Sequence, residues 1–152
     1  MKKIWTILLA LVCITGYTQE GDLPLEVKSA FDTKYQAVKI EDWRVENEQY
    51  YIDFTSKGGS YTALFDRQGA WLESAETISE LDIPATMMLT IRTNFPSGNI
   101  CICEKVETSE KQQYLRVTLI DAGNVDRVIR ADLDGKNIKL QDSLENRGTA
   151  SE

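Results

Sequence analysis

Apolar residues recur with a helical spacing in two stretches of the sequence that lie 60 residues apart. The repeated apolar positions are Val27, Phe31 and Tyr35 in the first stretch and Met87, Ile91 and Phe95 in the second. A spacing of four residues places such side chains on one face of a helix of about three turns. Asp22 and Asp82 precede these stretches as candidate N-caps, and Pro24 and Pro84 follow in the expected first turns. The sequence therefore predicts two amphipathic helices.

After each helical stretch the apolar period shortens to two, which is typical of half-buried strands. The alternating apolar residues are Tyr50, Ile52, Phe54, Tyr61, Ala63 and Phe65 in the first half and Leu115, Val117 and Leu119 in the second. Turn sequences separate the runs at residues 57–60, 66–69, 121–124 and 132–135. With further runs at residues 38–45, 70–73, 100–106, 127–131 and 136–140, each half predicts a helix followed by four antiparallel strands.

The predicted fold class is α+β, built from two tandem repeats that each pack an N-terminal helix on a four-stranded antiparallel sheet. Repeat 1 covers residues 19–80, and the diverged repeat 2 covers residues 81–142. Nine of the eleven aromatic residues after position 18 lie between positions 22 and 79, so the first repeat has the better-formed core. The pattern leaves open whether the two sheets are continuous, and whether the protein forms a dimer.

The N-terminus predicts export. Met1-Lys2-Lys3 is a short basic segment, and the apolar run at residues 4–14 is too short to span a bilayer. We expect residues 1–18 to be a cleaved signal peptide, whose loss changes the formal net charge from −7 to −9. The protein is then periplasmic or secreted, without membrane association after cleavage. The polar, aperiodic residues 143–152 predict a disordered tail.

Composition argues against several functions. With 24 Asp and Glu against 17 Lys and Arg, the chain has little attraction for phosphate backbones, so we expect no nucleic-acid partner. The sequence contains no His, which excludes His-dependent triads and His-containing zinc sites. The paired carboxylates at residues 41–42 and 46–48 fall at strand ends or turns, and no Gly-rich nucleotide-binding loop is present. The sequence predicts a protein that is not an enzyme and has no cofactor.

Two small motifs each have two interpretations. On a regular strand Cys101 and Cys103 point to one face and Ile100 and Ile102 to the other, with the cysteine Cα atoms about 6.5–7 Å apart, too far for an easy disulfide. The pair is a redox or metal-binding motif or, as we favour, two small hydrophobic side chains, because no further Cys after position 18 and no His complete a metal shell.

The second motif is Asp132-x-Asp134-Gly135-x-Asn137, which is half of a calcium loop or an ordinary hairpin turn. The corresponding turn at residues 66–69 lacks the second acidic residue, which favours the turn. The sequence does not decide whether Asp132 and Asp134 bind calcium.

The first half carries a family resemblance. The residues that carry it are Leu23-Pro24, Trp43, Tyr50-x-Ile52-x-Phe54 and Tyr61-x-Ala63-x-Phe65-Asp66-x-x-Gly69-x-Trp71. Together they resemble the repeat of the PepSY-like, beta-lactamase-inhibitor-like family of secreted bacterial proteins. The second half departs from this pattern, because Ala131 replaces Phe65 and Trp43 has no aromatic counterpart near Glu104.

What the resemblance implies is an architecture. Relatives of this fold include inhibitors that clasp a beta-lactamase with a concave sheet surface, and PepSY modules in propeptides that restrain a peptidase. The matched residues are core and turn positions, so no inhibitory residue is carried over to this chain. Function must therefore be argued from the site itself.

The sheet face away from the helices is the predicted partner-binding surface, because Tyr and Arg anchor many protein interfaces. Its residues are Tyr51, Asp53, Thr62, Leu64, Tyr114, Arg116, Thr118 and Arg130. An ordinary solvated sheet face is the alternative interpretation. The functional hypothesis is an exported, non-catalytic protein-binding module, a candidate inhibitor or regulator of a secreted or periplasmic hydrolase. The alternative is an envelope protein with a structural role, or one that binds a small ligand in a helix/sheet pocket lined by Trp43, Tyr50 and Trp71.

Overall fold

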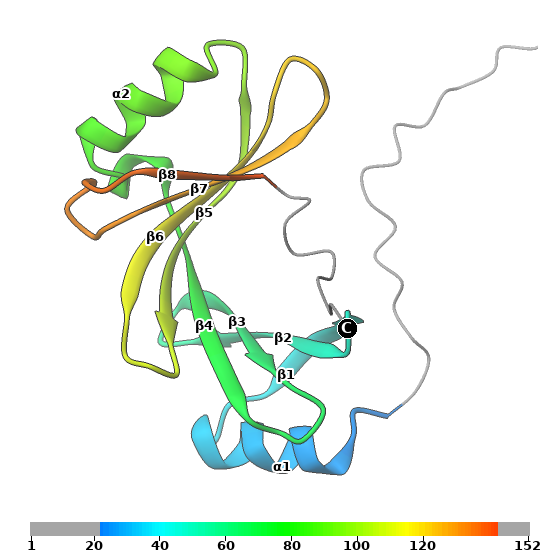
Figure 1. The fold of residues 1–152 in the computed structure, drawn as a ribbon. Helices are drawn as coiled ribbons and strands as arrows, with labels where there is room; N and C mark the ends of the chain where they lie inside the picture. Colours follow the sequence, from blue (N-terminus) through cyan, green and yellow to red (C-terminus); the bar gives the residue numbers. More distant parts are fainter. Residues whose placement is uncertain (1–21, 143–152) are drawn as a thin grey trace, which may run out of the picture.

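The computed structural model describes residues 22–142, so the predicted signal peptide and the predicted tail lie outside the described residues. The elements are α1 (Leu25–Lys34), β1 (Ile40–Glu46), β2 (Gln49–Ser56), β3 (Gly59–Phe65), β4 (Trp71–Ile78), the 3₁₀ helix η1 (Glu80–Asp82), α2 (Ala85–Asn94), β5 (Asn99–Thr108), β6 (Gln113–Ile120), β7 (Asp126–Ala131) and β8 (Lys139–Asp142). All eight strands form one antiparallel sheet in which each strand pairs with its neighbours in sequence (Figure 1). The predicted α+β class is confirmed.

The pairing of β4 with β5 joins the two halves of the chain. Its register runs from Glu73 opposite Thr108 to Ile78 opposite Cys103. The sequence left open whether the two predicted four-stranded sheets are continuous, and the structure shows that they form a single sheet of eight strands. Two separate sheets would leave β4 and β5 as edges with unpaired backbone groups, and pairing them satisfies those groups.

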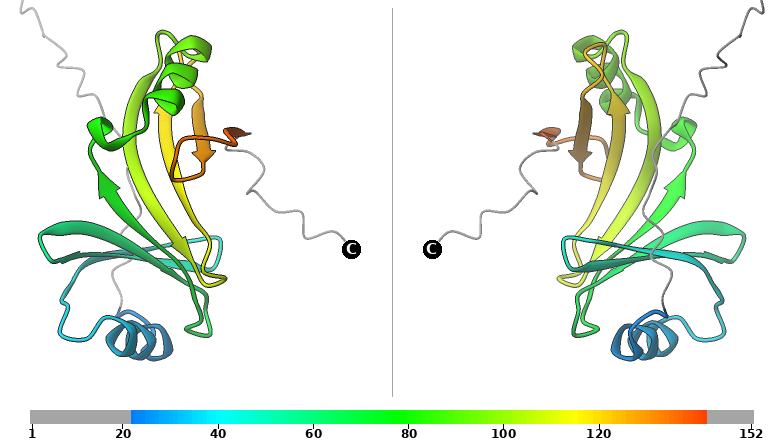
Figure 2. Two further views of the ribbon diagram at one scale, coloured as in Figure 1. Left: turned by 90° about the vertical axis from the view of Figure 1, so that its left-hand side faces the viewer. Right: turned by 90° about the vertical axis from the view of Figure 1, so that its right-hand side faces the viewer.

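The helices close two separate cores. Figures 1 and 2 show α1 and α2 at opposite ends of the bent sheet, one against each half. Val27 and Phe31 of α1 are fully buried against the first half, as Met87 and Ile91 of α2 are buried against the second. The sheet residues under the helices are the alternating ones that the sequence predicts: Ile52, Phe54, Ala63, Phe65, Leu115, Val117 and Leu119 are all buried.

The first core is aromatic. The Phe31 ring lies 5.0 Å from the Tyr35 ring, 5.2 Å from that of Phe54 in an edge-to-face contact, and 6.3 Å from that of Phe65. Such pairs stabilise a core beyond their buried area. The second core is built mainly from aliphatic side chains and Met.

The predicted aspartate caps of the helices are wrong. Pro24 and Pro84 occupy the N-cap positions, and neither helix has a side-chain cap hydrogen bond. Asp82 lies two residues before the N-cap of α2, and its carboxylate instead accepts a hydrogen bond from the backbone N–H of Ser79. It thereby completes a capping box on η1.

Each helix packs against the turn that follows the third strand of its half. Gly69 has φ +81°, and a Cβ added there would lie 2.7 Å from the carbonyl oxygen of Glu26 in α1. Gly135 has φ +77°, and its Cβ would lie 2.6 Å from both the Pro84 Cβ and the Thr86 Oγ1. Both turns therefore require glycine for two reasons, the left-handed backbone and the close approach of a helix.

We predict that Gly69→Ala destabilises the protein more than Gly58→Ala. Gly58 has a matching φ of +83°, but nothing lies within 4 Å of its added Cβ, so its cost is the left-handed backbone alone, about 1–2 kcal/mol. Gly69→Ala adds a clash with helix backbone that costs a further 1–3 kcal/mol, roughly. Urea unfolding of both variants measures the difference, and equal losses would show that α1 does not pack closely on this turn.

The Ile-Cys-Ile-Cys segment is not a regular strand. A register shift between Ile100 and Ile102 makes Cys101 the extra residue of a β-bulge. Ile100 and Cys103 therefore pack into the second core, while Ile102 points to the opposite face and Cys101 is exposed. The predicted alternation is wrong here, because the bulge places Ile100 on the face of Cys103 and leaves Cys101 exposed. Both thiols are free.

We predict that the two thiols differ sharply in reactivity. Burial, helped by the negative charges of Glu80 and Glu104, raises the pKa of Cys103 to about 11. At pH 8 about one in a thousand of these thiols is then ionised. In the protein beginning at Gln19, one maleimide should add at once to the native state and a second only in urea, as read by intact mass. Cys101→Ser should abolish the fast addition, and fast labelling of that variant would contradict the assignment.

Candidate functional site

The open face of the sheet carries a groove of about 740 Å³ to which all eight strands contribute. Its lining residues are Arg44, Glu46, Asn47, Gln49, Tyr51, Thr62, Leu64, Leu72, Glu73, Ile102, Glu104, Arg116, Thr118, Val128, Arg130 and Gln141. The strands bend so that the open faces of the two halves turn toward each other (Figure 1). Because the groove crosses the β4–β5 junction, it belongs to neither half alone.

The six residues predicted to bind a partner share this face. Tyr51, Leu64, Arg116 and Arg130 line the groove directly. The other two contact the lining residues as follows: the Asp53 carboxylate accepts a 2.6 Å hydrogen bond from Thr62 Oγ1, and the Tyr114 ring lies 4.9 Å from the guanidinium carbon of Arg130. Their grouping on one face follows from the strand alternation, and a role in binding stays a prediction.

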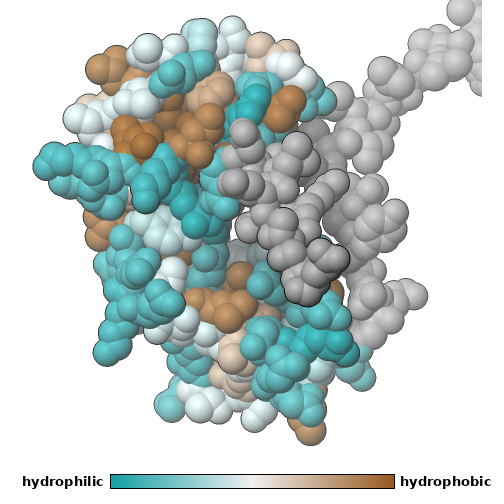
Figure 3. Space-filling view, viewed as in Figure 1, coloured by the Kyte–Doolittle hydropathy of each residue, from teal (hydrophilic) through white to brown (hydrophobic). Residues whose placement is uncertain are grey.

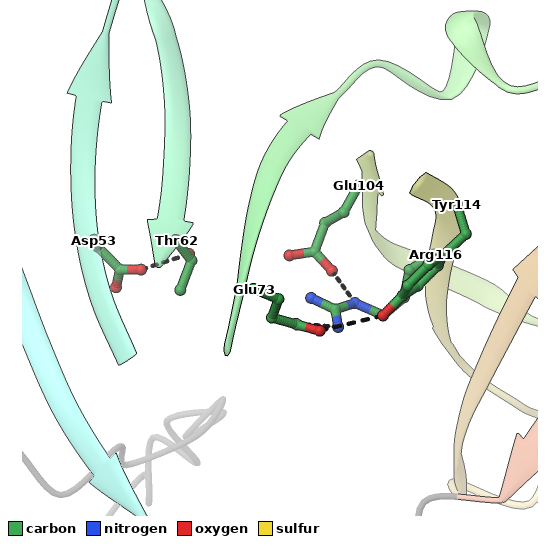
Figure 4. A network of polar contacts seen from close by, with 6 residues as sticks. All are labelled: Asp53, Thr62, Glu73, Glu104, Tyr114 and Arg116. Carbon is green, nitrogen blue, oxygen red and sulfur yellow. Dashed lines mark hydrogen bonds and ion pairs between the residues drawn. The ribbon is translucent and has the colours of Figure 1, made fainter. Parts of the chain in front are cut away.

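A buried ion cluster lies at the centre of the groove (Figure 4). Arg116 Nη1 lies 2.7 Å from Glu73 Oε1, and Arg116 Nε lies 2.7 Å from Glu104 Oε2. The three side chains are between 10% and 18% exposed. Tyr114 also donates a 3.2 Å hydrogen bond to Glu73. The cluster spans β4, β5 and β6, so it fastens the two halves together.

The surroundings of Arg116 determine its pKa. Burial alone would lower its pKa, but the hydrogen bonds and charges of Glu104 and Glu73 raise it well above the ordinary value. Arg116 is therefore a permanent cation held by two carboxylates, and it is fixed in orientation by both. Such a group supports the shape of the groove, and with all its charge already neutralised it offers little to a ligand.

Small apolar residues beneath the cluster complete the junction. Ala75 and Val106 are 2% and 0% exposed, although they lie on the face that no helix covers. They are register partners of each other, and Val106 also lies opposite Tyr114. Neither residue belongs to the two cores under the helices, so they give the junction a small core of its own.

Two tyrosines carry arginines on their rings, one in each half. The guanidinium carbon of Arg44 lies 4.6 Å from the Tyr51 ring centre, which mirrors the Arg130 and Tyr114 pair. Burial raises the pKa of both tyrosines, so both stay neutral at physiological pH. Stacked pairs of this kind present flat, rigid surfaces that lose little entropy on binding.

This face holds three residues that the sequence pattern did not indicate, Arg44, Glu73 and Glu104. A bulge in β4, where the register shifts between Leu64 and Phe65, moves Glu73 to the groove side out of simple alternation. Glu104 reaches Arg116 only because the two are register partners. Strand registers of this kind leave no signal in a single sequence, although an oppositely charged pair on two predicted neighbouring strands is a hint.

The other sequence candidates lie outside the groove. Asp132 accepts a 2.6 Å hydrogen bond from the Asn137 side chain, and Asp134 pairs with Lys136 at 2.8 Å, so the turn itself uses both carboxylates. Within residues 22–142, no group of three or more Cys, Asp or Glu side chains is placed to hold a metal. The aromatic residues of the predicted helix/sheet pocket, Trp43, Tyr50 and Trp71, pack against the first core. Trp71 also lines a shallow hollow beside α1.

The surface is divided in character. Figure 3 shows hydrophobic residues gathered over the upper half and a smaller group in the lower half, with hydrophilic residues between them along the left side. The groove mixes the two kinds, since Leu64, Leu72, Ile102 and Val128 line it together with the ion cluster. Apolar patches framed by polar groups are typical of interaction surfaces.

In the described part of the chain no helix is long and apolar enough to cross a membrane.

Solved structures of similar fold come from Bacteroides. A DUF2874 family protein from Bacteroides uniformis is 18% identical, with a TM-score of 0.63, over 79% of this chain and 89% of that one. A protein described as a candidate periplasmic protein from Bacteroides eggerthii is 17% identical, with a TM-score of 0.63, over 80% and 90%. A protein described as BLIP-like, meaning like a beta-lactamase inhibitor protein, from Bacteroides fragilis is 15% identical, with a TM-score of 0.60, over 87% and 94%.

At these identities the likeness shows the fold alone, which is beta-lactamase-inhibitor-like. No family model matches the chain, and no curated protein matches it. The finer resemblance to PepSY-like repeats stays a prediction.

We predict that Arg116→Met lowers the free energy of unfolding by about 3–5 kcal/mol, because it leaves two carboxylates enclosed without a counter-charge. The triple variant Arg116→Met/Glu73→Gln/Glu104→Gln removes all three charges and should recover most of that loss. Arg67→Met is the exposed control, because Arg67 and Glu48 are 60% and 74% exposed, and its cost should stay below about 1 kcal/mol. Urea unfolding measures all three, and an Arg116→Met loss as small as the control would show that the cluster does not fasten the halves.

Proposed function

We propose that this protein is an exported, non-catalytic module that binds another protein through the groove on the open face of its sheet. We propose further that the bound protein is a secreted or periplasmic hydrolase, which the module inhibits or regulates. One observation carries the proposal: a single groove, fixed by a buried ion cluster, presents Tyr, Arg and aliphatic side chains from seven of the eight strands. Tyr and Arg are among the residue types that are enriched at the centres of protein interfaces.

The solved structures of similar fold support the proposal at a coarser level. One is described as BLIP-like and another as a candidate periplasmic protein. Together with the signal peptide predicted at residues 1–18, they favour an exported protein that acts by binding. The absence of His from the sequence and the use of the groove carboxylates in ion pairs support a role without catalysis.

We also propose that the two halves are tandem copies of one PepSY-like unit, divided near residue 80. Each half has a helix followed by four strands. In each half, a glycine with positive φ in the turn after the third strand packs against the start of the helix. This shared glycine–helix contact supports duplication more strongly than the order of elements alone, because equivalent residues make equivalent contacts in the two halves.

Affinity capture from a periplasmic extract of the source bacterium tests the proposed function. We expect the wild type to retain a hydrolase and the Tyr51→Ala/Tyr114→Ala variant to bind it at least tenfold more weakly, since each substitution removes a stacked aromatic side chain from the groove. Mass spectrometry identifies the captured protein, and its hydrolytic activity should fall as the module is added.

The control is Leu25→Ala/Leu89→Ala, which removes two exposed side chains from the helices, at 76% and 69% exposure. It should bind like the wild type, and urea unfolding should show that both variants remain folded. Equal capture by the tyrosine variant would contradict the assignment of the groove. Recovery of a small molecule and no protein would instead favour the ligand-binding envelope protein.

A further inference from the structure

The groove has a positively charged end on β7 and β8. Glu104, Arg116, Arg130 and Lys139 lie side by side across four neighbouring strands, because each is the register partner of the next. Register partners in an antiparallel sheet point to the same face, so all four side chains point to the groove side. The row therefore carries one negative and three positive charges, in a protein whose formal net charge is −7.

Of the three positive charges, Arg116 is the one that the protein neutralises. Glu73 and Glu104 both pair with it. Arg130 and Lys139, which we call the cationic pair, form no ion pair within residues 22–142. Lys139 is exposed and Arg130 is half-buried, so the charge of the pair is accessible from the groove.

Two further acidic side chains lie at the opposite end of the groove. Glu46 and Asp53 pair with Arg44 of β1, at 3.4 Å and 3.2 Å. The three glutamates that line the groove, Glu46, Glu73 and Glu104, are thus engaged by Arg44 and Arg116. The cationic pair is left as a surplus of positive charge at the β7–β8 end.

The conformation of Arg130 prepares it for an anion. Its guanidinium is stacked on the Tyr114 ring, which holds the planar group in place. Its Nε is buried without a hydrogen-bond partner. Like charges directly opposite each other destabilise a sheet, and Arg130 lies directly opposite Lys139. A local cost of this kind is typical of a functional position, and an incoming negative charge relieves it.

We propose that the cationic pair binds Asp or Glu side chains on a surface segment of the partner protein, an inference that rests on the proposed function. A guanidinium matches a carboxylate with two parallel hydrogen bonds, and the lysine adds a second charge beside it. A continuous polyanion fits less well, because Glu46, Glu73 and Glu104 line the same groove and repel it. The partner therefore presents a short acidic segment at this end and neutral or apolar side chains along the rest of the groove.

The test compares Arg130→Met/Lys139→Met with Lys28→Met/Lys105→Met in binding to the captured partner. The control removes one positive charge from α1, at Lys28, and one from β5, at Lys105. Lys105 is exposed and follows Glu104 in sequence, so it lies on the other face of the sheet. We expect the groove variant to bind at least tenfold more weakly, with a smaller dependence on salt, and the control to bind like the wild type. Changing the partner's acidic contact residues to amides should weaken the wild type tenfold and leave the groove variant almost unaffected.

The outcomes separate the two proposals. If the partner is released by Tyr51→Ala/Tyr114→Ala but held as tightly by the Met variant as by the wild type, this inference is wrong and the proposed function stands. If the wild type captures no protein, both are wrong. If it captures no protein but binds phosphatidylglycerol vesicles through the cationic pair, the pair serves a lipid phosphate and this inference is overturned. Urea unfolding confirms that both variants are folded.

Discussion

The pairing of β4 with β5 is the constraint on which the rest of this structure depends. Each helix closes a core built mainly from its own half, and Ile78 of β4 is packed against the second core. The backbone ladder between these strands, the buried Ala75 and Val106 beneath it, and Arg116 between its two glutamates form the junction. Because the groove crosses this junction, its shape exists only while the junction is intact.

The energetics of the junction explain why it is polar. A buried arginine with two carboxylates gains little net stability over well-packed apolar residues, but it is costly to break by removing one partner. It also has directional bonds, so it fixes the angle at which the two halves meet better than non-directional packing would. The positive charges along the groove differ in whether they are already paired, so they have different roles. Arg116 supports the shape, and the cationic pair of Arg130 and Lys139 is left for a ligand.

The sequence predicts what depends on local periodicity and misses what depends on register. The inward faces of the strands follow from alternation, so Ile52, Phe54, Val117 and Leu119 are buried as expected. The bulge at Cys101 and the bulge in β4 each add a residue to one strand, which reverses alternation without any change of composition. The prediction of Asp82 as the cap of α2 is wrong because Asp82 belongs to the 3₁₀ helix η1, which the sequence pattern did not indicate.

The sequence predicts the sheet face that carries the candidate site, but it does not predict the ion cluster on that face. Strand alternation groups Tyr51, Leu64, Arg116 and Arg130 once the helices are placed on the other side. The contacts of Arg116 with Glu73 and Glu104 join residues 43 and 12 positions apart, and they require the β4–β5 and β5–β6 registers. The joining of the two sheets is likewise a long-range pairing, which hydrophobic periodicity within each half does not specify.

If the β4–β5 junction joins the halves into one unit, the two halves unfold together. In the protein beginning at Gln19, both tryptophans, Trp43 and Trp71, lie in the first half, and buried Cys103 lies in the second. Urea unfolding of the Cys101→Ser variant can be followed by tryptophan fluorescence and by pulsed maleimide labelling of Cys103. We expect one midpoint for both probes, because the junction makes the sheet a single cooperative unit. Two separate midpoints would show that the halves are independent domains, and the groove would then not be one fixed surface.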